Sequence, residues 1–106
     1  MPDITINDTT VVLRDSIAAA AVWKILPHLF SIGRGDNIFL KIPWDIARLM
    51  VMESVESWEF EGDPHDEAFY DSLTPAQLTD FFMPLVMQVF THITALVNET
   101  GEASGE

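Results

Sequence analysis

The segment from Thr74 to about Asn98 constrains the fold most strongly, because it has the pattern of one long helix that is apolar on nearly all sides. Thr74, Pro75 and Gln77 form a start signal, with a threonine cap, a proline at the first helical position and a glutamine placed for a capping box. Apolar residues then recur at helical spacing and predict an inward-facing stripe. This stripe comprises Leu78, Phe81, Phe82, Leu85, Val89, Ile93 and Leu96. A helix of this kind is either central to its domain or covered by a partner.

The flanks of this helix are the part of the sequence that most favours protein binding. Met and Phe side chains there suit an adaptable contact surface. The candidate partner-binding residues are Phe81, Met83, Met87, Phe90 and Val97. The alternative is that the same side chains belong to an ordinary core helix, although a domain this small has few places to bury a helix on all sides.

The N-terminal part predicts a short β-hairpin followed by a helix. Alternation in Ile4–Ile6 and β-branched residues in Thr10–Leu13 flank a turn signal at Asn7-Asp8. Asp15 or Ser16 is placed to cap a helix over residues 17–30, within which Pro27 is expected to cause a kink or an early end.

The middle of the chain predicts a second helix between two irregular segments. Residues 31–37 contain two glycines and predict a loop, and residues 38–42 fit a short strand or an extended connector. Pro43 suits the first turn of a helix that we expect from Trp44 to about Trp58. Residues 59–72 read as an acidic loop.

These elements together predict a mainly α fold, with three or so helices and a short N-terminal β-hairpin. The chain of 106 residues fits one domain, which we place at residues 1–98. Residues 99–106 are small, polar and acidic, and we expect a disordered tail. With no cysteine the core must come from packing alone, for which 48% hydrophobic residues suffice.

Charge is distributed very unevenly along the chain. Residues 1–50 hold five acidic and five basic side chains, whereas residues 51–106 hold twelve acidic ones and no lysine or arginine, giving a net charge of −12. This field repels phosphate backbones, so direct nucleic-acid binding is disfavoured. The negative charge suits binding to a basic partner, or a protein that itself mimics nucleic acid. The simplest alternative is that the charge only keeps the protein soluble.

Signatures of catalysis and ligand binding are not found in the sequence. The acidic loop fails EF-hand spacing, because Gly62 at the sixth position places Ser57 first and Ala68 twelfth, neither of them a carboxylate. The three histidines are far apart, and nothing matches a metalloprotease, P-loop or nucleophile-elbow pattern. We therefore expect no enzymatic activity, no cofactor and no metal. Without a secretory signal or charged anchors for a membrane span, we expect a cytoplasmic protein.

The order of these elements resembles that of the small tail assembly chaperones of long-tailed bacteriophages. The likeness rests on the opening hairpin, on the Val55-Glu56-Ser57-Trp58-Glu59 end of the middle helix, and on the Leu73-Thr74-Pro75-Ala76-Gln77-Leu78 helix start. It implies a non-enzymatic chaperone, acting in the host cytoplasm, that keeps an apolar helical tape-measure protein soluble. A homo-oligomer is also compatible with the apolar flanks.

The competing hypothesis is an acidic inhibitor that mimics nucleic acid and blocks a host nuclease or another basic partner. A chaperone should bind through the apolar flanks with little salt dependence. A mimic should bind through residues 53–71 with steep salt dependence.

Overall fold

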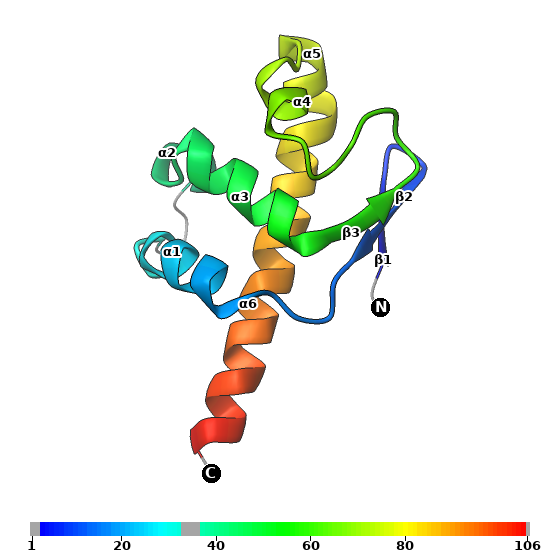
Figure 1. Cartoon of the computed structure of the whole chain (residues 1–106). Helices are drawn as coiled ribbons and strands as arrows, with labels where there is room; N and C mark the ends of the chain where they lie inside the picture. Colours follow the sequence, from blue (N-terminus) through cyan, green and yellow to red (C-terminus); the bar gives the residue numbers. More distant parts are fainter. Residues whose placement is uncertain (1–2, 33–36, 106) are drawn as a thin grey trace.

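The architecture is built around one long helix. The computed structural model describes residues 3–32 and 37–105, without the side chains at 38, 40 and 98–105. Figure 1 shows α6 running through the molecule, with the sheet on one side and α1 and α3 on the other. The elements in chain order are β1 (Asp3–Ile6), β2 (Thr9–Leu13), α1 (Ala19–Phe30), α2 (Ile38–Lys41), α3 (Trp44–Ser54), β3 (Val55–Trp58), α4 (Glu67–Asp71), α5 (Pro75–Gln77), the π-helical turn η1 (Leu78–Phe82) and α6 (Met83–Gly105).

The sheet corrects the predicted fold class. The described residues form a three-stranded antiparallel sheet in the order β1-β2-β3, so the fold is mixed α/β and the prediction of a mainly α fold with only a hairpin was wrong. The expected helix from Trp44 to Trp58 ends at Ser54, and its last residues become β3. The physical reason is the second edge of β2, whose backbone groups need partners and find them in β3, with Leu13 opposite Val55 and Val11 opposite Trp58.

The hairpin prediction is confirmed. Ile6 pairs with Thr9, which leaves Asn7 and Asp8 as a two-residue connection. Both have positive φ angles, 51° and 64°. Positive φ at both central residues is the requirement of a type I′ turn, which matches the twist of the strands and tolerates asparagine and aspartate.

Helix α1 begins later than predicted and passes through its proline. It starts at Ala19, and its N-cap Ala18 makes no side-chain cap bond, so neither Asp15 nor Ser16 caps it. The backbone contacts of Arg14 explain why the helix starts later. Its N–H donates to the Ser54 carbonyl at 2.7 Å, and its own carbonyl lies 2.7 Å from His92 Nε2. These bonds hold the chain extended at the end of β2. Pro27 does not end the helix, which continues to Phe30.

Two short helices replace expected irregular segments. Residues 38–41 form the turn α2 rather than a strand, and the Asn37 side chain accepts from the N–H of Phe39 at 2.9 Å. Within the predicted acidic loop, Asp66 caps α4 by accepting from the N–H of Ala68 at 3.0 Å. The short cap-to-helix pattern at Asp66 was missed because the surrounding charge suggested a solvated loop. The predicted loop at residues 31–37 lies partly outside the described residues, at 33–36.

The predicted start of the long helix is confirmed. Thr74 Oγ1 accepts from the N–H of Gln77 at 3.2 Å, and Gln77 Oε1 accepts from the N–H of Thr74 at 2.9 Å, which completes the capping box. The helical backbone continues past Asn98 to Gly105.

Pro84 explains the π-helical turn η1. A proline has no N–H, and its ring crowds the carbonyl of the residue four positions earlier. Here that residue is Asp80, and the helix widens into a π-helical turn over Leu78–Phe82. The Asp80 carbonyl instead accepts a hydrogen bond from the Asn7 side-chain amide at 2.7 Å, which ties the hairpin turn to the long helix.

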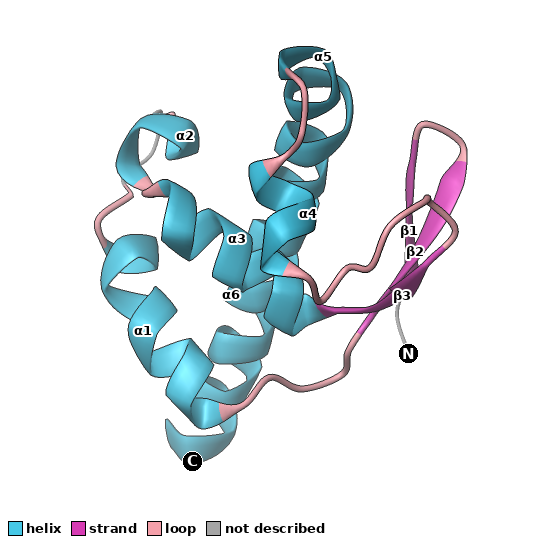
Figure 2. Ribbon diagram, turned by 45° about the horizontal axis from the view of Figure 1, so that its top comes forward, coloured by secondary structure: helices cyan, strands magenta, loops and turns pink. Residues whose placement is uncertain are grey.

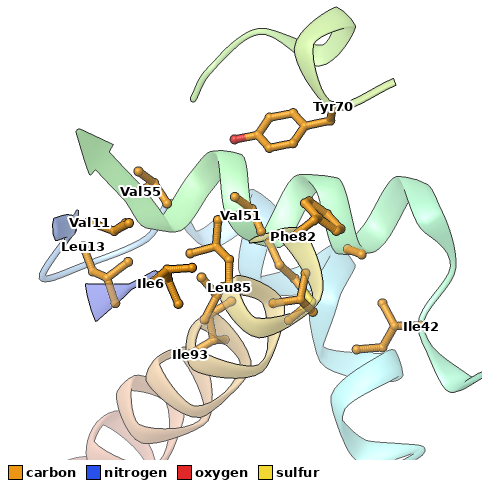
Figure 3. Close-up of a cluster of buried hydrophobic side chains, with 14 of the residues drawn as sticks. Ile6, Val11, Leu13, Ile42, Val51, Val55, Tyr70, Phe82, Leu85 and Ile93 are labelled. Carbon is orange, nitrogen blue, oxygen red and sulfur yellow. The ribbon is translucent and has the colours of Figure 1, made fainter. Parts of the chain in front are cut away.

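The core lies where the sheet, α3 and α6 meet. Figure 3 shows Ile6, Val11 and Leu13 from the sheet pointing towards Val51 and Leu85. Much of the stripe predicted on the long helix is buried here, namely Phe81, Phe82, Leu85, Val89 and Ile93. In Figure 2, viewed along a different direction, α1 and α3 lie together on the side of α6 opposite to the sheet.

Candidate protein-binding groove

The five predicted partner-binding residues do not share one environment. Phe81 is only 8% exposed and packs within an aromatic cluster, so most of its side chain belongs to the core. Met87 is 47% exposed. Met83, Phe90 and Val97 are half-buried, and Phe90 and Val97 pack against the edge of the core.

An apolar groove lies between α1 and the middle of α6, at residues 93–97. Its volume is about 640 Å³. Apolar side chains from both helices and from the segment before α1 line it, together with Asp15 and Ser16. We call it the α1–α6 groove, and its apolar lining consists of Ile17, Ala19, Val22, Trp23, Leu26, Ile93, Leu96 and Val97.

The packing of α1 explains why the groove exists. Helix α1 packs mainly on α3, which in turn packs on α6, so α1 reaches α6 indirectly. The inward residues Ala21, Ile25 and Leu29 are buried. The small side chain of Ala19 fills little of the remaining space between the two helices.

Trp23 is the most exposed large apolar side chain of the groove. It is 78% exposed on the groove lining, and Phe30 on the same helix is 76% exposed without lining the groove. Sequence reasoning missed both residues because it searched only the last helix for a second apolar stripe. Trp23, Leu26 and Phe30 also recur at helical spacing, offset from the buried stripe of α1, and this pattern could have revealed them.

The acidic segment after β3 is held in place by its own polar contacts. The Trp58 indole N–H donates to the Gly62 carbonyl at 2.9 Å, and the Tyr70 hydroxyl donates to the Pro64 carbonyl at 2.6 Å. Burial raises the pKa of Tyr70, and the negative charge of Asp63 raises it further. The Tyr70 hydroxyl therefore stays protonated and keeps donating its hydrogen bond across the physiological pH range.

One exposed ion pair joins this region to α3. The Asp71 carboxylate accepts from the Trp44 indole N–H at 2.9 Å and from Arg48 Nη1 at 2.7 Å. The hydrogen bond from Trp44 is the largest cause of a lowered pKa for Asp71, and Arg48 adds a hydrogen bond and its positive charge. The described residues contain no group of three or more histidine, aspartate or glutamate side chains that could hold a metal ion.

Residues 75–97 are the one helical stretch in the described residues that is long and apolar enough to cross a membrane, judged by length and composition. This stretch also supplies Leu85, Val89 and Ile93 to the core, so its apolar character has a structural cause. The expectation that the protein does not insert into a membrane stays a prediction.

Comparison with protein-family models, with curated proteins and with solved structures gave no match to this chain.

Proposed function

We propose that this chain is a non-enzymatic protein-binding module whose α1–α6 groove holds an apolar helical segment of a partner protein. The observation that carries the proposal is Trp23, a tryptophan left 78% exposed on the lining of an apolar groove of about 640 Å³. Tryptophan is enriched among the residues that dominate binding energies, and a groove between two helices suits the apolar face of a third.

Charge favours a different protein as the occupant over a second copy of this chain. Each copy carries a net charge of −12, so pairing two copies brings two strongly negative surfaces together. A neutral or basic helix meets no such repulsion. Within this proposal, the likeness to phage tail assembly chaperones makes a tape-measure protein the partner, and a gene position beside a tape-measure gene would support that finer assignment.

The test uses an amphipathic helical peptide made of alanine, leucine and glutamine, which is uncharged and so probes only apolar binding. We expect calorimetric titration to detect binding, and Trp23→Ala to weaken it about 10-fold, the equivalent of about 1.4 kcal/mol. Phe30→Ala is the matched control, since Phe30 is equally exposed on the same helix but lies outside the groove lining. Its affinity should stay within about twofold of the unmodified protein. An equal loss in both variants, or no binding at all, would contradict the proposal.

Salt dependence separates this function from nucleic-acid mimicry. The segment after β3 exposes Glu59, Glu61, Asp63, Asp66 and Glu67, and this acidic surface is the observation that favours a mimic. A natural partner held through the groove should bind with nearly the same affinity at low and high salt, whereas a partner held through the acidic surface should lose affinity steeply.

A further inference from the structure

A second cavity lies near the other end of the long helix from the α1–α6 groove. Its volume is about 320 Å³, and its apolar lining consists of three phenylalanines, Phe60, Phe69 and Phe81, together with Leu73 and Ala76. Glu61 and Asp80 also line it. We call it the aromatic cavity.

Trp58 organises the rings around this cavity. Its indole ring lies 5.7 Å from the ring of Phe60, 5.5 Å from that of Phe69 and 5.4 Å from that of Phe81, measured between centroids. Its N–H bond to the Gly62 carbonyl turns the chain back after β3. Phe60 is thereby brought against Phe81, with 4.5 Å between ring centroids. The walls are therefore supported from behind by a packed aromatic cluster.

The position of Asp80 follows from the π-helical turn. Pro84 deprives the Asp80 carbonyl of its ordinary helical donor, and the Asn7 amide binds that carbonyl at 2.7 Å. This bond fixes the backbone of Asp80 at the edge of the cavity, where its side chain is exposed. π-Helical turns are frequent at functional sites.

The two carboxylates of the cavity have no positive partner among the described side chains. No described lysine or arginine lines the cavity. Arg14 instead pairs with Glu56 at 2.9 Å, and Arg48 pairs with Asp71 at 2.7 Å. Residues 51–106 contain no lysine or arginine at all. The cavity thus combines aromatic walls with uncompensated negative charge.

We propose that the aromatic cavity binds a single lysine or arginine side chain of a partner protein. Aromatic rings attract a cation, the carboxylates of Glu61 and Asp80 accept its hydrogen bonds, and the apolar walls cover its alkyl stem. A volume of about 320 Å³ is at the lower end of the range for ligand pockets, about 300–1,000 Å³, which favours a side chain over a larger molecule. This site goes beyond the α1–α6 groove and does not depend on it.

The test is an amide nuclear magnetic resonance titration with N-acetyl-lysine methylamide as the probe. We expect saturable shifts at the amides of Glu61, Asp80 and Phe81. The uncharged analogue N-acetyl-norleucine methylamide, which has a similar stem, should shift them much less. The double variant Glu61→Gln/Asp80→Asn should bind the lysine probe about 10-fold more weakly, because both charge-assisted contacts are removed.

The matched control is Glu59→Gln/Glu67→Gln, which removes the same charge from exposed positions of the same region that do not line the cavity. Its affinity for the lysine probe should stay within about twofold of the unmodified protein. The proposal is overturned if the control loses as much affinity as the cavity variant, if the norleucine probe binds as well as the lysine probe, or if neither probe shifts these amides. Stronger shifts with calcium than with the lysine probe would also overturn it, in favour of a metal site. The Trp23→Ala variant should bind the lysine probe normally, so failure of this site and failure of the groove are distinguishable.

Discussion

Substituting Gly62 with alanine should destabilise the protein strongly for two reasons. The backbone angle at this position favours glycine, and the space beside it is too small for a side chain. Its φ angle is +100°, a conformation that residues with a Cβ rarely adopt. A Cβ at this position would overlap ring carbons Cδ1 and Cε1 of Phe69 and lie 3.2 Å from Cζ.

The loss in the free energy of unfolding can be estimated from the backbone strain and from the contacts that Phe69 must give up. The backbone strain costs about 1–2 kcal/mol. Relief of the clash requires Phe69 to leave its contacts with Trp58 and Tyr70, whose ring centroids lie 5.5 Å and 5.2 Å away. Each aromatic pair contributes about 0.5–1.5 kcal/mol. The sum predicts a loss of about 2–5 kcal/mol in the free energy of unfolding.

The assay is urea denaturation followed by far-ultraviolet circular dichroism, run as a double-mutant cycle. In a Phe69→Ala background the clash is already gone, so Gly62→Ala should cost only the backbone strain of about 1–2 kcal/mol. A cost that is the same in both backgrounds would refute the assigned role of Phe69. A cost below about 1 kcal/mol in the unmodified background would refute the reasoning altogether.

Three further changes test other parts of the account. Ser54 is fully buried, and its hydroxyl has no hydrogen-bond partner among the described groups, so Ser54→Ala should raise the free energy of unfolding by about 1 kcal/mol, measured from urea midpoints. Because hydrogen bonds from Trp44 and Arg48 lower the pKa of Asp71, its stabilising contribution is present above the unfolded pKa of about 3.9 and is lost as the pH falls through the lower folded pKa. The stability difference between the unmodified protein and Asp71→Asn should therefore shrink on acidification, and a difference that grows would contradict this linkage. Asn7→Ala should cost about 1–2 kcal/mol through its positive φ and its lost bond to the long helix, whereas Asn7→Gly, which keeps the turn, should cost less in thermal melts.

Local signals in the sequence were sufficient to predict those elements whose stabilising contacts are made between nearby residues. The Asn7-Asp8 turn and the capping box at Thr74 and Gln77 each depend on residues within a few positions of one another. Periodicity likewise predicted the buried face of the long helix at Leu85, Val89 and Ile93.

Helix α4 was missed although its cap at Asp66 is local, whereas other missed features depend on distant parts of the chain. Val55 and Trp58 are apolar and have the spacing that continues a helix, but residues 55–58 become β3 because an edge of β2 is available to pair with them. The π-helical turn itself follows from the nearby Pro84, but the hydrogen bond from Asn7 that satisfies the Asp80 carbonyl comes from a distant part of the chain. The spacing of Trp23 and Leu26 within α1 could have revealed a second apolar stripe, but the groove itself combines α1 with α6, and no pattern within one helix shows that α1 packs mainly on α3.

The most direct test of the central claim is a map of where an apolar helix binds. The amides of the protein are followed by nuclear magnetic resonance during titration with the uncharged alanine, leucine and glutamine peptide. We predict that the largest shifts fall at Val22, Trp23 and Val97, on both sides of the α1–α6 groove. Shifts concentrated in the acidic segment at residues 59–71, or absent from the groove at saturation, would contradict the account.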